Sequence, residues 1–564
     1  MSFRTATIAF LVALAFGGLA ADRCASDERR RVPIVVDLPN PVDVRSYSSF
    51  EKAVAAIGTS ERTLLIPNTQ SVAVDVIVPT NVSLRFLKGG SLEISSSKNV
   101  IINGSLDAPI DRIFSTTGRI TFGAGKIDKI YPQWWGADNN EFSTEDRTAI
   151  EAAIGAAPAG GTVFFPGGSQ FYKIDDRITV DKSITLSGAG PSSQIRQTTA
   201  TKGALLLTGS DVTVTRLAIH GPQSVDNNSN ENGIYAAGSD ADNYIANLSI
   251  RDCVISNFGD YAIRAEFVED FDITNNTIDT IWFAGIGMLS CRWGEVIRNG
   301  ISHIDSGAGN FSNYGITATR SGGYDLATKP RCQGIVISKN TIRGVSGKSG
   351  LDTHGGEGIS FVDNRLHDCR YGINIGPSLG AAALEYAPSF CSAVGNSVDA
   401  GALSGGAQNG LIVVGAFDGV LRQKAFHNKL IANTVIGYGT DTSSHANAVY
   451  IDDSQNTIVA NNVIVESSRN GIYLCHENYD FSITGNIITD SWSESSQARG
   501  IYINGGENNR GYIGANTFAK DSKIAANVMT WAIYIDDQAG IEIVLGKNRS
   551  EADNYLYDPG GHSQ

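Results

Sequence analysis

Residues 349–376, SGLDTHGGEGISFVDNRLHDCRYGINIG, contain one full copy of a pattern that recurs over about three hundred residues of the chain. Its first mark is an Asn or Asp followed by a small or polar residue and then an apolar one. Many of the intervals between these marks are 23 or 24 residues. The marked positions are Asp252, Asn276, Asn299, Asn340, Asn364, Asn396, Asn433, Asn462, Asn486 and Asn516. Such a period predicts a stack of coils at ~4.8 Å per turn, with the amides forming a structural ladder inside the turns.

A second mark in the same stretch, Gly-Ile-x or a close variant, predicts a stripe on the outer surface. If Ile points inward, x points outward, because strand side chains alternate between faces. The x positions are Tyr235, Arg264, Gly287, Thr317, Asp352, Asn374, Tyr450, Tyr473, Tyr502 and Tyr534. Two residues further on, the same side receives Glu266, Thr319, His354, Asp452, Cys475, Asn504 and Asp536. Long intervals around 321–348, 377–408 and 417–447 predict loops that wall this stripe as a groove.

Composition agrees with an all-β chain and narrows its partners. Among 564 residues there are 62 Gly and only 3 Met, which favours short strands joined by tight turns over helical bundles. The net charge of -14 argues against nucleic acid and anionic membranes as partners, since both reward Lys and Arg. This negative charge does not argue against neutral glycans as partners, whereas binding of an anionic glycan needs a local cationic group or a bridging ion to offset the charge. No cofactor is required on this basis, and Ca²⁺ stays open.

The N-terminus reads as a secretory signal peptide over residues 1–21, MSFRTATIAFLVALAFGGLAA. Its apolar run is shorter than the ~20 residues that a membrane span needs. We therefore expect a secreted protein, extracellular or periplasmic, without a membrane span. The seven Cys show neither CxxC nor zinc-ligand spacing, and we expect most of them in the core, with room for one disulfide.

The remaining chain divides by pattern. A linker over 22–45 precedes a β-rich cap module over 46–132. A segment with a capping helix then spans 133–200, and the repeats fill 201–548 before a tail over 549–564. An amphipathic helix, a turn and an apolar strand occur twice, near residue 50 and again about a hundred residues later.

The second copy carries a family resemblance. Residues 131–168, YPQWWGADNNEFSTEDRTAIEAAIGAAPAGGTVFFPGG, resemble the N-terminal segment of pectate-lyase-like right-handed parallel β-helix proteins, a superfamily that includes phage tailspikes and depolymerases. The resemblance implies an all-β, right-handed, single-stranded parallel β-helix with short capping helices and long groove-lining loops. It also implies that Trp134 and Trp135 close the core, and it is compatible with a homotrimer.

The richest chemistry in the repeats lies at Asp352, His354 and Glu357. Glycoside hydrolysis needs two carboxyl groups, and Asp352 can pair with Glu357 or with Asp325 from the preceding loop. β-Elimination at a uronate needs a base, such as His354, and a cation, such as Arg320 or Arg343. Asp-Thr-His-Gly-Gly is also good turn sequence, so a purely structural role stays open.

The same residues resemble a motif of alginate C5-epimerases. LDTHGG followed by RLHDCRYGI is similar to their D-P-H motif and following H-D, with Asp352 and His354 at the two acting positions. Thr353 stands where the proline is expected, and Gly355 where an acidic residue is expected. The resemblance implies that epimerisation belongs among the alternatives.

We expect substrate contacts elsewhere on the stripe and its walls. The candidates are Arg264, Arg320, Asn374, Tyr450, Asp452, Asp453, Tyr473, His476, Trp282 and Trp293. For Asp452, Asp453 and His476, which lie ~15–20 Å from His354, a turn-forming role is favoured. The tyrosines can stack on sugars or simply on one another.

The sequence therefore predicts an exported enzyme that degrades a polysaccharide or oligosaccharide by hydrolysis or β-elimination. The alternatives are a non-catalytic, tailspike-like glycan-binding module and a uronan C5-epimerase. These classes differ in whether a glycan is cleaved, merely retained, or changed in configuration without being shortened.

Overall fold

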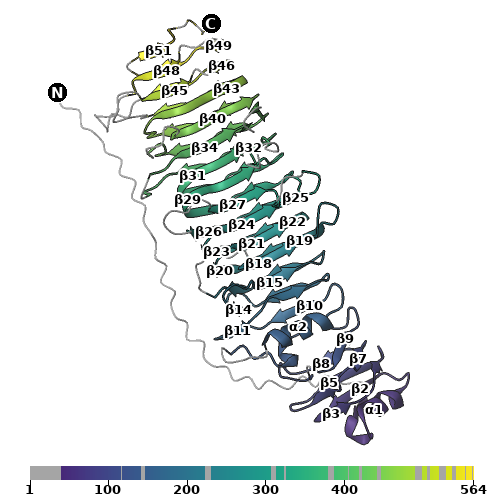
Figure 1. Ribbon diagram of the computed structural model, residues 1–564. Coiled ribbons are helices and arrows are strands. Elements are labelled where there is room, and N and C mark those ends of the chain that lie inside the picture. Colours follow the sequence, from purple (N-terminus) through teal and green to yellow (C-terminus); the bar gives the residue numbers. More distant parts are fainter. Residues whose placement is uncertain are drawn as a thin grey trace, which may run out of the picture.

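The computed structural model (Figure 1) describes residues 40–563 apart from 116, 141–145, 223–229, 306–312, 323–325, 379–385, 404–405, 418–421, 441–445, 490–497, 505–508, 520–528, 537–541, 553, 560 and 562. The predicted signal peptide and Asp325 lie outside the described residues. Most of the chain forms one 40-stranded sheet in which each strand pairs in parallel with the strand about three places further on. Such pairing means that every turn of the coil contributes one strand to each of three faces.

We call the three faces A, B and C. Face A contains β10 (Thr162–Phe165), β13 (Thr185–Gly188), β16 (Thr213–Thr215), β19 (Ile245–Arg251), β22 (Val268–Thr274), β25 (Arg292–Ile297), β28 (Val336–Ser338), β30 (Ser360–Val362), β32 (Ser392–Val394), β38 (Lys429–Ile431), β41 (Ile458–Ala460), the second half of β43 (Asn470–Thr484), β46 (Arg510–Gly514) and β49 (Glu542–Leu545).

Face B contains β11 (Phe171–Ile174), β14 (Gln194–Gln197), β17 (Ala218–His220), β20 (Val254–Phe258), β23 (Thr277–Ile281), β26 (Gly300–Ile304), the first halves of β29 (Thr341–His354) and β31 (Arg365–Gly376), β33 (Ser397–Asp399), β39 (Thr434–Ile436), β42 (Val463–Val465), β44 (Ile487–Thr489), β47 (Thr517–Ala519) and β50 (Arg549–Ser550).

Face C contains β12 (Ile178–Val180), β15 (Leu205–Leu207), β18 (Ile234–Ala237), β21 (Tyr261–Glu266), β24 (Ala284–Leu289), β27 (Tyr314–Thr319), the second halves of β29 and β31, β34 (Asn409–Val414), β40 (Asn447–Gln455), the first half of β43, β45 (Arg499–Ile503), β48 (Trp531–Ile535) and β51 (Asn554–Tyr557). A short hairpin, β35 (Ala416–Phe417) with β36 (Arg422–Gln423), and then β37 (Ala425–Phe426) lie between β34 and β38. The predicted all-β parallel β-helix is confirmed.

The chain before the large sheet repeats the same construction on a smaller scale. Three small parallel sheets comprise β1 (Pro41–Asp43), β2 (Arg62–Ile66), β5 (Val82–Phe86) and β8 (Leu106–Asp107); β3 (Thr69–Val72) with β6 (Ser91–Ile94); and β4 (Val76–Val78), β7 (Asn99–Ile102) and β9 (Arg119–Phe122). The strands of the coil thus begin before residue 201 and end after residue 548. The Asn mark, which spans residues 252–516, identifies only part of the stack.

The two predicted helices are α1 (Phe50–Ile57) and α2 (Asp146–Ala156), and the 3₁₀ segments η1 (Val44–Ser46) and η2 (Pro132–Trp135) accompany them. Each helix buries one apolar face, for example Phe50, Val54 and Ile57 in α1. Trp134 and Trp135 are buried against Phe114 and Phe122 in edge-on and tilted contacts. The core expectation for the tryptophan pair is confirmed. No helix in the described part of the chain is long and apolar enough to span a membrane.

The Asn ladder forms as predicted, with one correction. In each step the Oδ1 of one Asn accepts from the main-chain N–H and the Nδ2 of the Asn one turn earlier, as between Asn364 and Asn340 (2.9 and 3.0 Å). Asp252 is not part of it, because Cys253 occupies the ladder position and its N–H donates to Asn276. Asp252 lies one residue earlier, at a left-handed corner (φ 57°). The ladder continues past Asn516 to Asn548.

Candidate functional site

The predicted outer stripe runs along face C in unbroken register. The aligned residues are Tyr235, Arg264, Gly287, Thr317, Asp352, Asn374, Ile412, Tyr450, Tyr473, Tyr502, Tyr534 and Tyr557. The residue before each x position points into the core, as Leu351 and Ile373 do. Ile412 and Tyr557 join the stripe although their Gly-Ile-x match is weak or missing.

Asp352 lies on this stripe, yet its side chain is completely buried. Its Oδ1 is 3.0 Å from Nε2 of His354 and accepts from the Thr317 hydroxyl at 3.3 Å, while its Oδ2 accepts from Nδ2 of Asn374 at 2.8 Å. Burial by itself would raise the pKa of Asp352. The charge and hydrogen bond of His354, together with Lys348 and Asn374, outweigh it and hold that pKa below its usual value. Asp352 is therefore a buried carboxylate.

His354 is held on both ring nitrogens. Nδ1 is 3.1 Å from the Pro377 carbonyl oxygen, and Nε2 faces Asp352 and lies 3.3 Å from the Tyr314 hydroxyl. A carbonyl oxygen and a carboxylate oxygen are both hydrogen-bond acceptors, so each ring nitrogen of His354 faces an acceptor. The ring has no nitrogen left for a substrate. His354 thus directs both ring nitrogens toward protein atoms and pairs with the buried carboxylate of Asp352. The catalytic roles expected of Asp352 and His354 stay predictions.

Glu357 is separated from this pair. It bridges to Gln333 and Ser389 on the line between faces C and A, and its carboxylate accepts from Nε2 of Gln333 at 3.2 Å. The left-handed Gly355 (φ 68°) turns the chain away from the stripe before Glu357 is reached. Arg343 lies on the face B half of β29 and is exposed. Neither residue is brought to Asp352.

A pocket of about 280 Å³ opens on face C beside the Asp352–His354 pair. Its walls carry one ammonium group, two phenols and several amides, and no Asp or Glu among the described residues. The lining residues are Lys348, Ser349, Tyr371, Asn374, Gln408, Asn409, Ile412, Val414 and Tyr450. Of the predicted contacts, Asn374 and Tyr450 lie here. Because Asp352 holds Nδ2 of Asn374, the orientation of that amide at the pocket is fixed from below.

Sequence reasoning missed Lys348, Tyr371 and Gln408. Ser349, Tyr371 and Asn409 are paired with one another across adjacent turns, immediately before the Gly of each Gly-Ile-x mark. The residue before that Gly was therefore the available signal for part of the pocket. Nothing in the repeat marks Lys348 or Gln408, because Lys348 lies where β29 shifts register between Val345 and Ser349 and Gln408 precedes β34.

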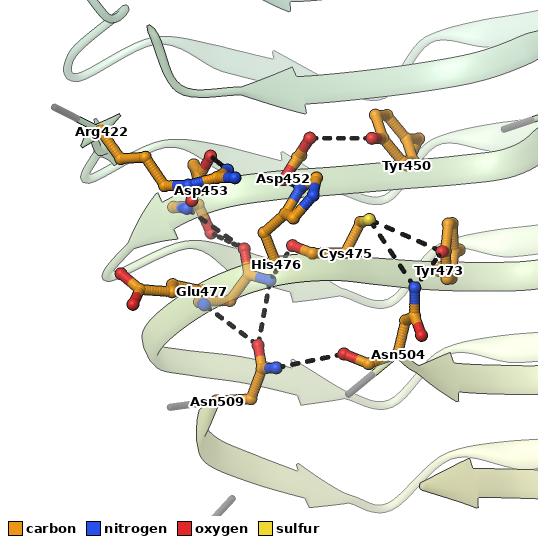
Figure 2. Close-up of polar contacts among 12 residues, drawn as sticks. Arg422, Tyr450, Asp452, Asp453, Tyr473, Cys475, His476, Glu477, Asn504 and Asn509 are labelled. Atoms are coloured by element: carbon orange, nitrogen blue, oxygen red, sulfur yellow. Dashed lines mark hydrogen bonds and ion pairs between the residues drawn. The ribbon is translucent and has the colours of Figure 1, made fainter. Parts of the chain in front are cut away.

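A second polar cluster follows the pocket toward the C-terminus (Figure 2). Asp452 accepts from the Tyr450 hydroxyl at 2.8 Å and lies 2.7 Å from Nδ1 of His476. Burial raises the pKa of Asp452, although His476 and Tyr450 oppose the shift. Cys475 lies beside Asp452 in register, and its Sγ accepts from the Tyr473 hydroxyl at 3.6 Å. Burial also raises the pKa of the Cys475 thiol.

Asp453 points to a different set of partners. Arg422 donates to its Oδ2, and Lys424 contacts its Oδ1 at 3.1 Å and Glu477 at 2.8 Å. Two cations thus neutralise Asp453, which is buried. The contacts tie the β36 hairpin and the following residues to β40 and β43, so Asp453 has a bracing role in this structure.

The tyrosines of the C-terminal turns stack on each other. Ring centroids are 5.7 Å apart for Tyr450 and Tyr473, and 5.0 Å apart for Tyr473 and Tyr502, the latter pair being nearly parallel. Arg499 lies 4.1 Å over Tyr502 and also over Tyr534. Tyr473 is only 6% exposed, so its ring faces are occupied by its neighbours. This arrangement is a cross-strand aromatic ladder.

A third cluster lies nearer the N-terminus of face C. Arg264 is 2.8 Å from Glu266 and 3.8 Å from Asp260, and all three side chains are largely buried. Burial raises the pKa of Asp260 to about 6, with Arg264 and Asn232 opposing and Glu231 assisting. Burial also acts to raise the pKa of Glu266, but the hydroxyls of Ser321 and Tyr235 and the charge of Arg264 bring it below the usual value. Asp260 was missed because it precedes the repeat mark.

The other predicted contacts are dispersed. Nε of Arg320 donates to the Ser378 hydroxyl at 2.8 Å. Trp282 follows β23 at the corner between faces B and C. Trp293 lies on face A, 54% exposed, with Arg292 against its ring at 4.5 Å. Arg264 is three turns of the coil away from Asp352 and Trp293 lies on another face, so neither shares one site with the pocket.

Two family models match overlapping parts of the chain. One, described as rhamnogalacturonase A/epimerase, pectate lyase-like, matches residues 135–374. The other, described as periplasmic copper-binding protein (NosD), matches residues 303–561. Curated protein sequences give no significant match.

Solved structures agree on the architecture. The N-terminal fragment of gene product 12 of bacteriophage Phi29 gives a TM-score of 0.56 at 14% identity, covering 76% of this chain and 72% of that one. The chain is a parallel β-helix protein, and its residues 135–374 are similar to the pectate-lyase-like family.

Two other solved structures are less similar to this chain. The GH87 α-1,3-glucanase of Streptomyces thermodiastaticus gives a TM-score of 0.40 at 15% identity, covering 78% of this chain and 69% of that one. The A-module of the Azotobacter vinelandii mannuronan C-5 epimerase AlgE6 gives a TM-score of 0.39 at 15% identity, covering 77% of this chain and 98% of that one.

Proposed function

We propose that the protein is an exported enzyme that binds an acidic polysaccharide along face C and degrades it, with one sugar residue in the face C pocket. The pocket carries this proposal. At about 280 Å³ it lies just below the roughly 300–1,000 Å³ range of small-ligand pockets, which suits one sugar residue of a longer chain. The first family model, whose description includes a rhamnogalacturonase, supports a polysaccharide as the substrate class.

The lining assigns a role to each kind of group. Lys348 supplies the positive charge that a sugar carboxylate needs in a chain of net charge -14. Amides of Asn374, Gln408 and Asn409 can donate to and accept from sugar hydroxyls. Tyr371 and Tyr450 offer rings with a polar end, which suits a sugar edge.

The geometry favours β-elimination over hydrolysis by two carboxyl groups. Asp352 and Asp452 are three turns apart, or ~14 Å, whereas the two carboxyl groups of glycosidases lie roughly 5–9.5 Å apart. None of the described pocket-lining residues is Asp or Glu. Elimination at a uronate instead requires a cation that neutralises the sugar carboxylate and a base that takes the C5 proton. Lys348 can supply the cation, and Tyr371 as a phenolate can take the C5 proton and pass it to the leaving oxygen as the C4–O bond breaks and the C4=C5 double bond forms.

A panel of acidic and neutral polysaccharides, each with and without chelator, tests the proposal. Products are followed by reducing ends and by the absorbance of 4,5-unsaturated uronates. Unsaturated product from an acidic substrate is the expected result. Reducing ends without unsaturation would reassign the protein to hydrolysis, and retention without any product would reassign it to glycan binding alone. The homotrimer stays a prediction.

A further inference from the structure

The cluster beside the pocket contains three different metal-binding donors. Asp452, Cys475 and His476 each offer one ligand atom, and these atoms all lie within 4.8 Å of one another (Figure 2). The His476 Nδ1 and Asp452 Oδ1 atoms are already 2.7 Å apart. A tetrahedral zinc site separates its ligand atoms by about 3.3–3.6 Å, given metal–ligand distances of about 2.0–2.3 Å. Small side-chain rotations therefore bring all three atoms to a common ion.

The corner of the coil explains how two consecutive residues reach the same side. Cys475 pairs with Asp452 in register, so both point outward from face C. The next residue in a strand would point inward, but His476 adopts a left-handed conformation (φ 50°) and the ladder shifts register between Asp452 and Ser454. Cys475 and His476 thus face the same space.

The three donor side chains also differ in their exposure to solvent, which bears on how an ion would reach them. Cys475 is buried and the side chain of Asp452 is 12% exposed, whereas the side chain of His476 is 42% exposed. An ion can enter from the His476 side and reach donors that bulk water hardly touches.

We propose that Asp452, Cys475 and His476 bind one transition-metal ion of borderline softness, with Zn²⁺ as the reference ion. Thiolate and imidazole donors select such ions, whereas Ca²⁺ and Mg²⁺ take oxygen ligands. The Ca²⁺ considered from composition is therefore not the ion of this cluster. Three protein ligands leave a fourth position open, as in zinc sites that accept an external ligand. Tyr450, bonded to Asp452, lines the pocket, so the site lies at its edge.

The test uses the full chain without an affinity tag and without glycan, so its outcome is independent of the proposed degradation of polysaccharide. Zn²⁺ is titrated by calorimetry, and Co²⁺ is added as a spectroscopic probe of thiolate ligation. We expect one Zn²⁺ per chain, a thiolate-to-cobalt charge-transfer absorption, and no competition by millimolar Ca²⁺. Cys475→Ser is expected to abolish the absorption and to weaken Zn²⁺ binding by about 100-fold or more.

Two further variants guard against misfolding and against nonspecific binding. His476→Ala changes a half-exposed side chain and is expected to weaken Zn²⁺ binding by a similar factor with an unchanged circular dichroism spectrum. His303→Ala is the matched control, because His303 lies 2.6 Å from Asp279 in an exposed His–carboxylate pair. It should leave binding unchanged. Absence of Zn²⁺ binding, or binding that survives both Cys475→Ser and His476→Ala, overturns the proposal.

Discussion

Replacing Asp260 with Asn should change how the stability of the protein depends on pH. Asp260 is 5% exposed and its pKa is raised from 3.8 to about 6, chiefly by burial. Between these two pH values the folded chain holds a proton that the unfolded chain has released. The contribution of Asp260 to the free energy of unfolding therefore falls as the pH rises from about 4 to about 6.

The magnitude follows from the shift. At about 1.4 kcal/mol per unit, a rise from 3.8 to about 6 corresponds to about 3 kcal/mol. Asp260→Asn has nearly the same size, keeps an acceptor for Asn232 and carries no charge. Its stability relative to wild type should improve by about 3 kcal/mol between pH 4 and pH 7, and should level off beyond.

The measurement is urea unfolding followed by tryptophan fluorescence at several pH values. Asp240→Asn is the control, since Asp240 is exposed and hydrogen bonds from the Asp242 N–H and from Asn243 lower its pKa. The stability of Asp240→Asn relative to wild type should fall, not rise, as the pH increases. A difference between Asp260→Asn and wild type that stays constant with pH would refute the assignment of Asp260 as a buried, protonated carboxyl.

Three other changes have definite expected outcomes. Asn364→Ala leaves the Asn340 N–H without its partner and removes three other hydrogen bonds. Urea titration should therefore show a free energy of unfolding that is lower by about 3–6 kcal/mol. The control, Ser360→Ala on the outer surface, should lower it by less than ~0.5 kcal/mol. Asp352→Asn removes a buried carboxylate with three hydrogen-bond partners and should cost about 1.5–3 kcal/mol at pH 7. Because the pKa of Asp352 is lowered, this cost should shrink as the pH falls below about 4, and a pH-independent cost would argue against an ionised Asp352. Tyr473→Ala should cost about 3 kcal/mol of stability and leave glycan affinity nearly unchanged, whereas a large loss of affinity at constant stability would mark Tyr473 as a sugar platform.

The repeat made the scaffold predictable from sequence. Both the Asn ladder and the outward stripe depend on local marks that recur once per turn, and strand alternation converts such marks directly into faces. The wrong placement of Asp252 in the ladder also follows from this dependence on local marks. Cys253 occupies the ladder position at the right spacing, but a Cys does not match the Asn or Asp pattern.

The site was less predictable than the scaffold, because strand register predicts which way a side chain points but not whether that side chain is buried. Asp352 does point outward, as expected, but Thr317, His354 and Asn374 cover it completely. Lys348 carries no repeat mark, and its place in the pocket depends on how the surrounding turns pack. The opposite shifts of Asp260 and Glu266 also depend on burial and partners that no spacing reveals.

The most direct test of the proposed function is the affinity of a uronate oligosaccharide for Lys348→Ala, measured by calorimetry beside wild type and Lys429→Ala. Lys429 is an exposed lysine on face A, so its loss changes the net charge equally without touching the pocket. A charge-assisted hydrogen bond is worth about 1.5–3 kcal/mol, which predicts an affinity about 10–150 times weaker for Lys348→Ala and no change for Lys429→Ala. Equal affinities of all three proteins for the oligosaccharide would contradict a glycan site in the face C pocket.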